Sequence, residues 1–395
     1  MEAYILDWLN LLLRWLHMIA GIAWIGASFY FVMLDNSLKA PSKSEDARRG
    51  VFGELWAVHG GGFYVSQKFP TGPKGEPLAS DLHWSKWEAY TTWLSGMGLL
   101  AIIYWLGAAT YLVDKSVLDI SPLSGIALSV ATIVGGWLVY DALCRIFGSN
   151  ENVLAGLVFA FVVALSWVLF HVFGARAAYM HVGAMLGTIM VANVFFVIIP
   201  GQKRMVAEIR AGRDPDPAPG LAGKQRSVHN TYFTLPVLFV MISNHYPMTF
   251  GQRYGWLVLC VIMLAGVLIR QFFVLRHKGL VQPALPIAAG LLLAGVAAAI
   301  APSVSAPNEK VAFSKVQGVI AQRCTTCHAA QPRQEGFAQP PKGVMLETTE
   351  QIAAQASKIN ETVSTRYMPI GNLTQMTDDE RALIGAWFVQ GAKTQ

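Results

Sequence analysis

The most chemically specific motif in the chain is Cys-x-x-Cys-His at residues 324–328. Two thiols at this spacing can form thioethers to both vinyl groups of a haem, and the adjacent histidine then lies beneath the iron. The motif therefore predicts one covalently attached c-type haem, held by Cys324 and Cys327, with His328 as an axial ligand of the iron. A haem of this kind carries single electrons, so the motif predicts a role in electron transfer.

Two predicted helices flank this motif. A stretch over 311–322 has apolar residues at helical spacing, and the Thr-Asp-Asp-Glu sequence at 377–380 is a capping box that begins a terminal helix. A helix on each side of the attachment motif resembles the arrangement in class I cytochromes c. We therefore expect residues 310–395 to form a domain of that type, joined by a linker over 303–309.

The resemblance to class I cytochromes c implies that the second axial ligand is a methionine, whose thioether raises the reduction potential relative to a second histidine. The candidates are Met345, Met368 and Met376. Met368 precedes a proline just before the last predicted helix, where class I cytochromes c place their ligand, so we expect Met368 to bind the iron. We expect Met345 to pack near the haem edge and Met376 to lie too close to the helix cap.

The rest of the chain has the composition of a membrane protein. Of the 395 residues, 54% are hydrophobic and only 14% are charged, against roughly 25% charged in an ordinary soluble domain. Apolar runs of about 20 residues can cross a bilayer. Such runs lie near 8–34, 88–113, 122–144, 152–174, 179–200, 229–247, 252–275 and 282–302. We expect an all-α fold, with a polytopic bundle of about eight transmembrane helices over 1–302 and the cytochrome c domain after it.

The charges of the loops predict an orientation. Lysines and arginines gather in the loops over 35–87 and 201–228, whereas the connections on the other side contain only Lys115, Arg176 and Arg253. By the positive-inside rule, the basic loops face the cytoplasm. Haem is attached to such motifs on the outer side of the bacterial inner membrane, which gives the same answer. We expect a multi-pass inner-membrane protein whose N-terminus and cytochrome c domain are periplasmic.

Four histidines fall in the outer half of the predicted bundle: His17, His171, His181 and His245. Ionisable groups at membrane depth are costly and are usually functional, so these residues are candidate ligands of a second, b-type haem. The run over 17–26 also resembles the first helix of haem-binding membrane oxidases of the protoporphyrinogen oxidase and copper-resistance D type. The alternative for each histidine is a hydrogen-bonded residue between helices.

The predicted helix over 229–247 has polar residues at both ends and Pro236 inside, which is typical of a helix that lines a cavity. Asn193, Arg270 and Gln271 are further candidate cavity residues. For Arg270 the alternative is a side chain that snorkels to the cytoplasmic interface.

Four segments, at residues 15–17, 54–64, 83–88 and 243–247, together with the fused cytochrome, resemble the bacterial membrane-bound urate hydroxylase family. The resemblance covers essentially the whole chain. It implies oxidation of urate to 5-hydroxyisourate in purine catabolism. It also implies that electrons leave through the cytochrome c domain to an external cytochrome c or a terminal oxidase, instead of reducing oxygen to hydrogen peroxide.

The residue types suit this substrate. Urate is anionic, flat and rich in amide groups, so its site needs a cation, amide partners and aromatic walls. Its oxidation releases two electrons and two protons, so a histidine or a carboxylate must accept protons. The residues that we expect to be catalytic are His59, His83, Lys86, Glu88 and Asn244.

The predicted orientation separates this loop from the c-type haem. Electrons released at the cytoplasmic side would have to cross a hydrocarbon core of about 30 Å, which is too far for one transfer. Either a b-type haem on the outer histidines relays them, or the substrate site lies near the periplasmic side, and the sequence leaves both open.

Two other functions fit parts of the sequence. A quinol-to-cytochrome c oxidoreductase would use the histidines to hold haem and would take electrons from a lipid-soluble quinol. A membrane-anchored cytochrome would carry electrons for a partner and have no substrate of its own. Nothing resembles a phosphate-binding loop, a hydrolase triad or a nucleic-acid-binding patch. The net charge of +6 is explained by the basic loops that set topology.

Overall fold

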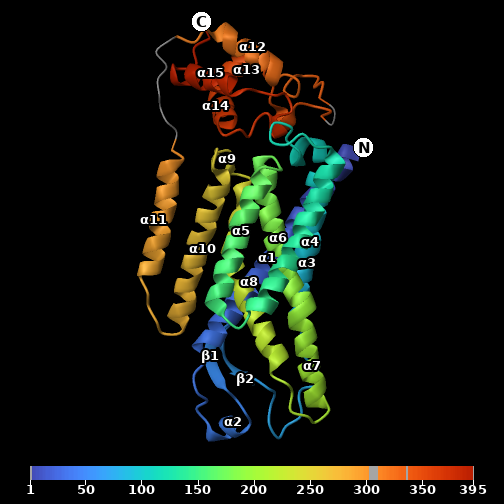
Figure 1. Cartoon of the computed structure of the whole chain (residues 1–395), viewed down its shortest axis with the longest axis vertical. Helices are drawn as coiled ribbons and strands as arrows, with labels where there is room; N and C mark the ends of the chain where they lie inside the picture. The colour runs from blue at the N-terminus through green and yellow to red at the C-terminus, as the bar shows by residue number, and fades with distance from the viewer. Residues whose placement is uncertain (1, 302–309, 335–336, 395) are drawn as a thin grey trace.

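The computed structural model describes residues 2–301, 310–334 and 337–394. They are mostly helical, and Figure 1 shows a bundle of long helices with a small domain at one end and a two-stranded hairpin at the other. The long helices of the bundle are α1 (Glu2–Ser37), α3 (Trp87–Leu100), α4 (Pro122–Phe147), α5 (Glu151–Phe170), α6 (Ala175–Ala192), α8 (Ala218–Ser243), α10 (Gly255–His277) and α11 (Ala284–Ala299). The shorter ones are α2 (Ser44–Arg48), α7 (Ile199–Arg210) and α9 (Pro247–Phe250).

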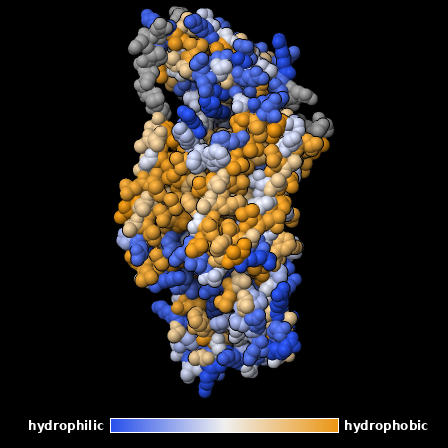
Figure 2. Space-filling model, in the orientation of Figure 1, coloured by the Kyte–Doolittle hydropathy of each residue, from blue (hydrophilic) through white to orange (hydrophobic). Residues whose placement is uncertain are grey.

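Within the described residues, five helices are long and apolar enough to cross a membrane: Tyr4–Ser37, Pro122–Phe147, Glu151–Phe170, Ala175–Arg210 and Gly255–His277. Figure 2 shows the matching surface, a hydrophobic band around the middle of the molecule with hydrophilic surface at both ends. The span Ala175–Arg210 joins α6 and α7 through a π-helical segment, η3 (Asn193–Ile198). Its 36 residues correspond to about 54 Å of helix, so it extends beyond a hydrocarbon core of about 30 Å.

The other three expected spans take less regular forms. The run over 88–113 is α3 followed by two π-helical segments, η1 (Ala101–Trp105) and η2 (Ala108–Leu112). The run over 229–247 belongs to α8, whose first half is polar, and the run over 282–302 contains the shorter apolar helix α11. Segments of π-helix are usually associated with functional sites, and η2 lies against the small domain.

The all-α expectation fails in the loop over 35–87. Strands β1 (Gly53–His59) and β2 (Gly62–Lys68) form an antiparallel hairpin in which His59 faces Gly62 and Gly53 faces Lys68. The two turn residues, Gly60 and Gly61, have φ angles of 57° and 78°. A two-residue turn with positive φ at both positions matches the twist of the strands, and glycine adopts it without steric cost.

The small C-terminal domain contains α12 (Phe313–Arg323), α13 (Thr349–Ala354), α14 (Ala356–Ser364) and α15 (Asp378–Val389). Its core includes Val316, Ile320, Ile384 and Trp387, which are almost fully buried. The helices expected on either side of the Cys-x-x-Cys-His motif are α12 and α15. The expected linker over 303–309 lies outside the described residues.

Small residues set the distance between the central helices of the bundle. A Cβ atom added at Gly183 of α6 would lie 2.5 Å from Cγ1 of Val240 in α8. Gly187, one turn further along α6, has no atom within 4 Å of such a position. Because helices without side chains at the contact can approach closely, Gly183 is required by the packing of α6 on α8, whereas Gly187 is not.

This difference gives a paired prediction. Gly183→Ala should lower the free energy of unfolding by about 1–3 kcal/mol, because the added methyl group overpacks the contact with Val240. Gly187→Ala should raise it by about 0.5–1 kcal/mol, because alanine is a better helix former. Thermal unfolding of both variants in detergent measures the two effects. Equal stability of the two variants would contradict this account of the helix contact.

Candidate functional site: a cavity between the bundle and the C-terminal domain

A cavity of about 610 Å³ lies between the C-terminal domain and one end of the bundle. Residues of the C-terminal domain that line it include Cys324, Cys327, His328 and Met368. The bundle contributes Tyr111, Arg176, Asn244, His245 and Pro247. The two cysteines, the histidine and one methionine predicted to hold a haem therefore face one common space, and the bundle closes its other side.

The ring of His328 is oriented for a metal ligand. Its Nδ1 lies 3.0 Å from the carbonyl oxygen of Val344. That oxygen can only accept, so the ring donates from Nδ1 and keeps the lone pair of Nε2. Metal-binding histidines commonly have this second hydrogen bond, which fixes the tautomer and the orientation of the ring.

Both thiols lie in the turn that follows α12. The backbone N–H groups of Cys327 and His328 donate to the carbonyl oxygen of Cys324, at 3.2 and 2.9 Å, and this turn brings the three side chains to the same cavity. Burial raises the pKa of the Cys324 thiol to about 12 and also raises the pKa of Cys327. Both sulfurs are therefore protonated near neutral pH.

The three candidate methionines occupy different environments. Met368 lines the cavity, whereas Met376 is buried in the core of the C-terminal domain. Met345 is 37% exposed and, in the described part of the chain, is not among the residues that line the cavity. Of the three, Met368 is thus the one that lines the same cavity as His328, so the residues present fit a haem held by a histidine and a thioether.

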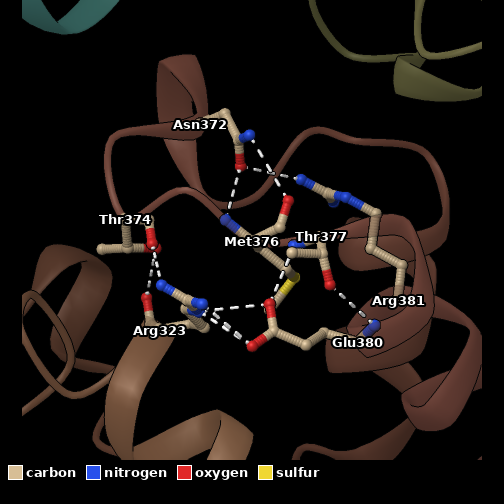
Figure 3. A network of polar contacts seen from close by, with 7 residues as sticks. All are labelled: Arg323, Asn372, Thr374, Met376, Thr377, Glu380 and Arg381. Carbon is tan, nitrogen blue, oxygen red and sulfur yellow. Dashed lines mark hydrogen bonds and ion pairs between the residues drawn. The ribbon is translucent and has the colours of Figure 1, made fainter. Parts of the chain in front are cut away.

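A hydrogen-bond network fixes the loop that carries Met368. Arg381 donates to the carbonyl oxygen of Met368 at 2.7 Å and to Oδ1 of Asn372 at 3.2 Å. Figure 3 shows this arginine beside the start of α15, where the backbone N–H of Glu380 donates to Thr377 Oγ1 and that of Thr377 donates to Glu380 Oε2. The predicted capping box is confirmed, and it anchors the loop.

Comparison with known families concerns the bundle. Residues 3–301 match the family model described as urate oxidase N-terminal. The chain belongs to the urate oxidase N-terminal family. No similar chain is found among curated proteins or among solved structures. The match covers the bundle and the hairpin and supports a urate-related oxidoreductase, and it ends before the C-terminal domain.

The four outer histidines, which all belong to the urate oxidase N-terminal region, lie in different environments. His245 lines the cavity, and His171 is exposed, with Nδ1 2.8 Å from the carbonyl oxygen of Trp167. His17 contacts α3, with Nδ1 2.9 Å from the carbonyl oxygen of Thr92. Within the described residues, no hydrogen bond or ring contact joins two of the four.

His181 is fully buried and both of its ring nitrogens have partners. Nδ1 lies 2.7 Å from the carbonyl oxygen of Ala177, and Nε2 lies 2.7 Å from the hydroxyl oxygen of Ser129. A haem iron on Nε2 would have to displace this hydroxyl group. The b-type haem on these histidines stays a prediction.

The structure separates one of the residues predicted to be catalytic from the others. His59 is exposed at the end of β1, and His83 is exposed in the loop before α3. Lys86 occupies the N-cap position of α3, with its ammonium group 5.7 Å from the ring of Trp87, and Glu88 lies in the first turn. Asn244 instead follows the last residue of α8, lines the cavity and accepts a hydrogen bond from Arg176 at 2.9 Å. The other four are not among the residues that line the cavity.

A buried polar network inside the family region includes residues that the sequence suggested only as cavity groups. Arg226 donates to Asp141 at 2.7 Å and to Asn193 at 3.3 Å. Asn193 donates to Asn230 at 2.8 Å and to the hydroxyl group of Tyr140 at 3.1 Å. The charges and amides satisfy one another, so this network joins α4, η3 and α8 without requiring a ligand.

The placement of the methionines predicts how the haem iron responds to substitution. Met368→Ala should retain covalent haem but lower its midpoint potential on the order of 100 mV, a part of the roughly 0.8 V that axial ligands span. Met345→Ala is the matched control and should leave the potential nearly unchanged. Spectroelectrochemical titration of the purified protein measures both values. A lower midpoint potential in Met345→Ala, with an unchanged potential in Met368→Ala, would assign the iron ligand to Met345 instead.

Proposed function

We propose that this protein oxidises urate to 5-hydroxyisourate in the membrane and passes the electrons through a covalent c-type haem to an external acceptor. The proposal rests on one observation: the same chain contains a urate oxidase N-terminal region and a cavity with residues suited to hold a c-type haem. A urate oxidase N-terminal region forms the bundle, and its end closes a cavity that contains Cys324, Cys327, His328 and Met368. An external cytochrome c or a terminal oxidase is the acceptor that this arrangement suits.

The chain's own residues have separate tasks in this proposal. Cys324 and Cys327 would attach the haem, and His328 and Met368 would bind its iron. The haem, when bound, would accept one electron at a time. Urate loses two electrons and two protons, and water adds to the oxidised ring carbon, so the haem must be oxidised by the acceptor between the two electrons.

The bundle closes one side of the cavity that would hold the haem. Arg176 is held by Asn244 at 2.9 Å, and its guanidinium carbon lies 6.0 Å from the ring centroid of Tyr367, the residue before Met368. These contacts hold the iron-ligand loop against the bundle.

We further propose that the chain crosses the bacterial inner membrane eight times, with the N-terminus and the C-terminal domain in the periplasm. The five long apolar helices support five spans. The segment from α3 through η2, together with α8 and α11, would supply the other three. The charge pattern supports the orientation, because the basic loops lie at the hairpin end and the C-terminal domain lies at the other end (Figure 1).

The decisive experiment is a spectrum of the detergent-purified protein before and after addition of urate without oxygen. We expect urate to reduce the c-type haem, and we expect Cys327→Ala to lose covalent haem and most turnover with an external acceptor. An accompanying b-type band would support the outer histidine site. Failure of urate to reduce the haem, with reduction by a quinol analogue, would replace this proposal by the quinol-to-cytochrome c function.

A further inference from the structure

Arg270 of α10 is buried within the bundle. It is only 4% exposed, so its side chain does not snorkel to the surface, which was one of the two interpretations of the sequence. Its guanidinium carbon lies 4.2 Å from the ring centroid of Phe29 in α1. The charge is therefore held among α1, α8 and α10, which pack on one another.

Two of the three nitrogens of the Arg270 guanidinium group lack a hydrogen-bond acceptor among the described residues. Within the described residues, Nε and Nη2 are both buried and have no partner, and no carboxylate forms an ion pair with this side chain. Arg226, the other deeply buried arginine of the bundle, is instead paired with Asp141 at 2.7 Å. A buried unpaired charge is costly, and buried polar groups without partners are rare in native structures.

The two unpartnered nitrogens have a specific geometry. Nε–H and one N–H of Nη2 point in parallel from the same edge of a guanidinium group, and this edge forms the two-pronged hydrogen bond to planar anions. A third buried nitrogen without a partner, Nδ1 of His277, lies seven residues further along α10 and therefore on the same face of the helix. Within the described residues, three of the five buried polar side-chain atoms without a partner thus lie on one side of α10, and the other two belong to Tyr104 and Arg381.

Gln271, the next residue of α10, and Phe29 are of the residue types that a site for a flat, amide-rich anion needs beside a cation. The hydroxyl group of Tyr232 donates to the carboxamide oxygen of Gln271. This contact orients the amide and leaves its NH₂ group as the hydrogen-bonding group that Gln271 can offer. Phe29 provides an aromatic face beside the cation.

We propose that Arg270 binds the anionic edge of urate inside the bundle, with Gln271 as an amide partner and Phe29 as an aromatic wall. The identity of the anion rests on the proposed function. The two parallel N–H groups of Arg270 would donate to an adjacent ring nitrogen and carbonyl oxygen of the urate anion. The ligand supplies the negative charge that no described side chain provides.

This site lies far from the haem cavity. Helix α10 begins at Gly255, at the end of the bundle near α9 and the C-terminal domain (Figure 1). Arg270 lies fifteen residues after Gly255 and seven residues before the last residue of the helix. Fifteen residues correspond to about 22 Å of helix. The substrate would therefore bind toward the hairpin end, which the charge pattern assigns to the cytoplasm.

The test compares Arg270→Gln with Arg276→Gln, an exposed arginine in the last turn of the same helix. Two quantities are measured in the purified protein with haem attached: equilibrium binding of radiolabelled urate to the oxidised protein, and the KM for urate in anaerobic reduction of the haem. Arg270→Gln should weaken urate binding about 100-fold or more, the size of two lost charge-assisted hydrogen bonds. Arg276→Gln should bind urate as the unchanged protein does.

A second variant covers the case in which Arg270→Gln does not fold. Gln271→Glu replaces the proposed amide partner by a carboxylate that repels an anion, and should weaken urate binding strongly while the haem spectrum and the thermal stability are kept. Normal urate affinity in Arg270→Gln or in a folded Gln271→Glu would overturn the inference.

The two measurements separate this inference from the proposed function. If urate binds to the unchanged protein but does not reduce the haem, the proposed function is refuted. The role of Arg270 is then decided by whether Arg270→Gln weakens urate binding. Urate that reduces the haem equally well in Arg270→Gln would refute the role of Arg270 and leave the function in place. Absence of both binding and reduction in the unchanged protein would refute both.

Discussion

Close docking of the C-terminal domain on the bundle is the constraint on which the cavity that contains Cys324, Cys327 and His328 depends. Gly371 has a φ of 55°, and a Cβ atom there would lie 2.7 Å from the carbonyl oxygen of Thr110. Such an approach is possible only for glycine. Tyr367 packs on the other side of this contact, with its ring 6.5 Å from that of Phe250. Because Met368 follows Tyr367 directly, the backbone contact between domains also positions an expected iron ligand against the bundle.

The parts that could be predicted from the sequence are those encoded by neighbouring residues. The spacing at 324–328 and the capping box at 377–380 are local, and the structure shows a shared cavity for the first and both hydrogen bonds of the second. The hairpin is not predicted from the sequence, and residues 35–87 are expected to form a loop, although a glycine pair between two short segments is a turn signal. The separation of Asn244 from the loop over 35–87 depends on how helices far apart in the chain pack, which local sequence does not encode.

The two buried arginines of the bundle show how the same residue type can serve structure or binding. Arg226 has a carboxylate partner in Asp141 and an amide partner in Asn193, so its desolvation is offset by the fold itself. Arg270 has an aromatic face but no described acceptor for two of its nitrogens. From the sequence both are cations near apolar runs. Only the packing of the helices around them distinguishes an arginine whose hydrogen bonds are satisfied by the protein from one that has nitrogens without an acceptor.

Placing urate near Arg270 and the haem at the opposite end would give the reaction a direction across the membrane. Protons released from urate would stay on the hairpin side, while electrons would travel outward through the bundle. Aromatic rings form part of a route, since Tyr179 contacts Phe250 at 5.8 Å and Phe250 contacts Tyr367 at 6.5 Å. The free energy of an electron falls by about 2.3 kcal/mol per 100 mV when it moves outward across a membrane with a negative interior. The membrane potential would therefore favour the oxidation of urate. This is a physical reason for a bundle that separates the substrate region from the electron acceptor, instead of a site that places them side by side.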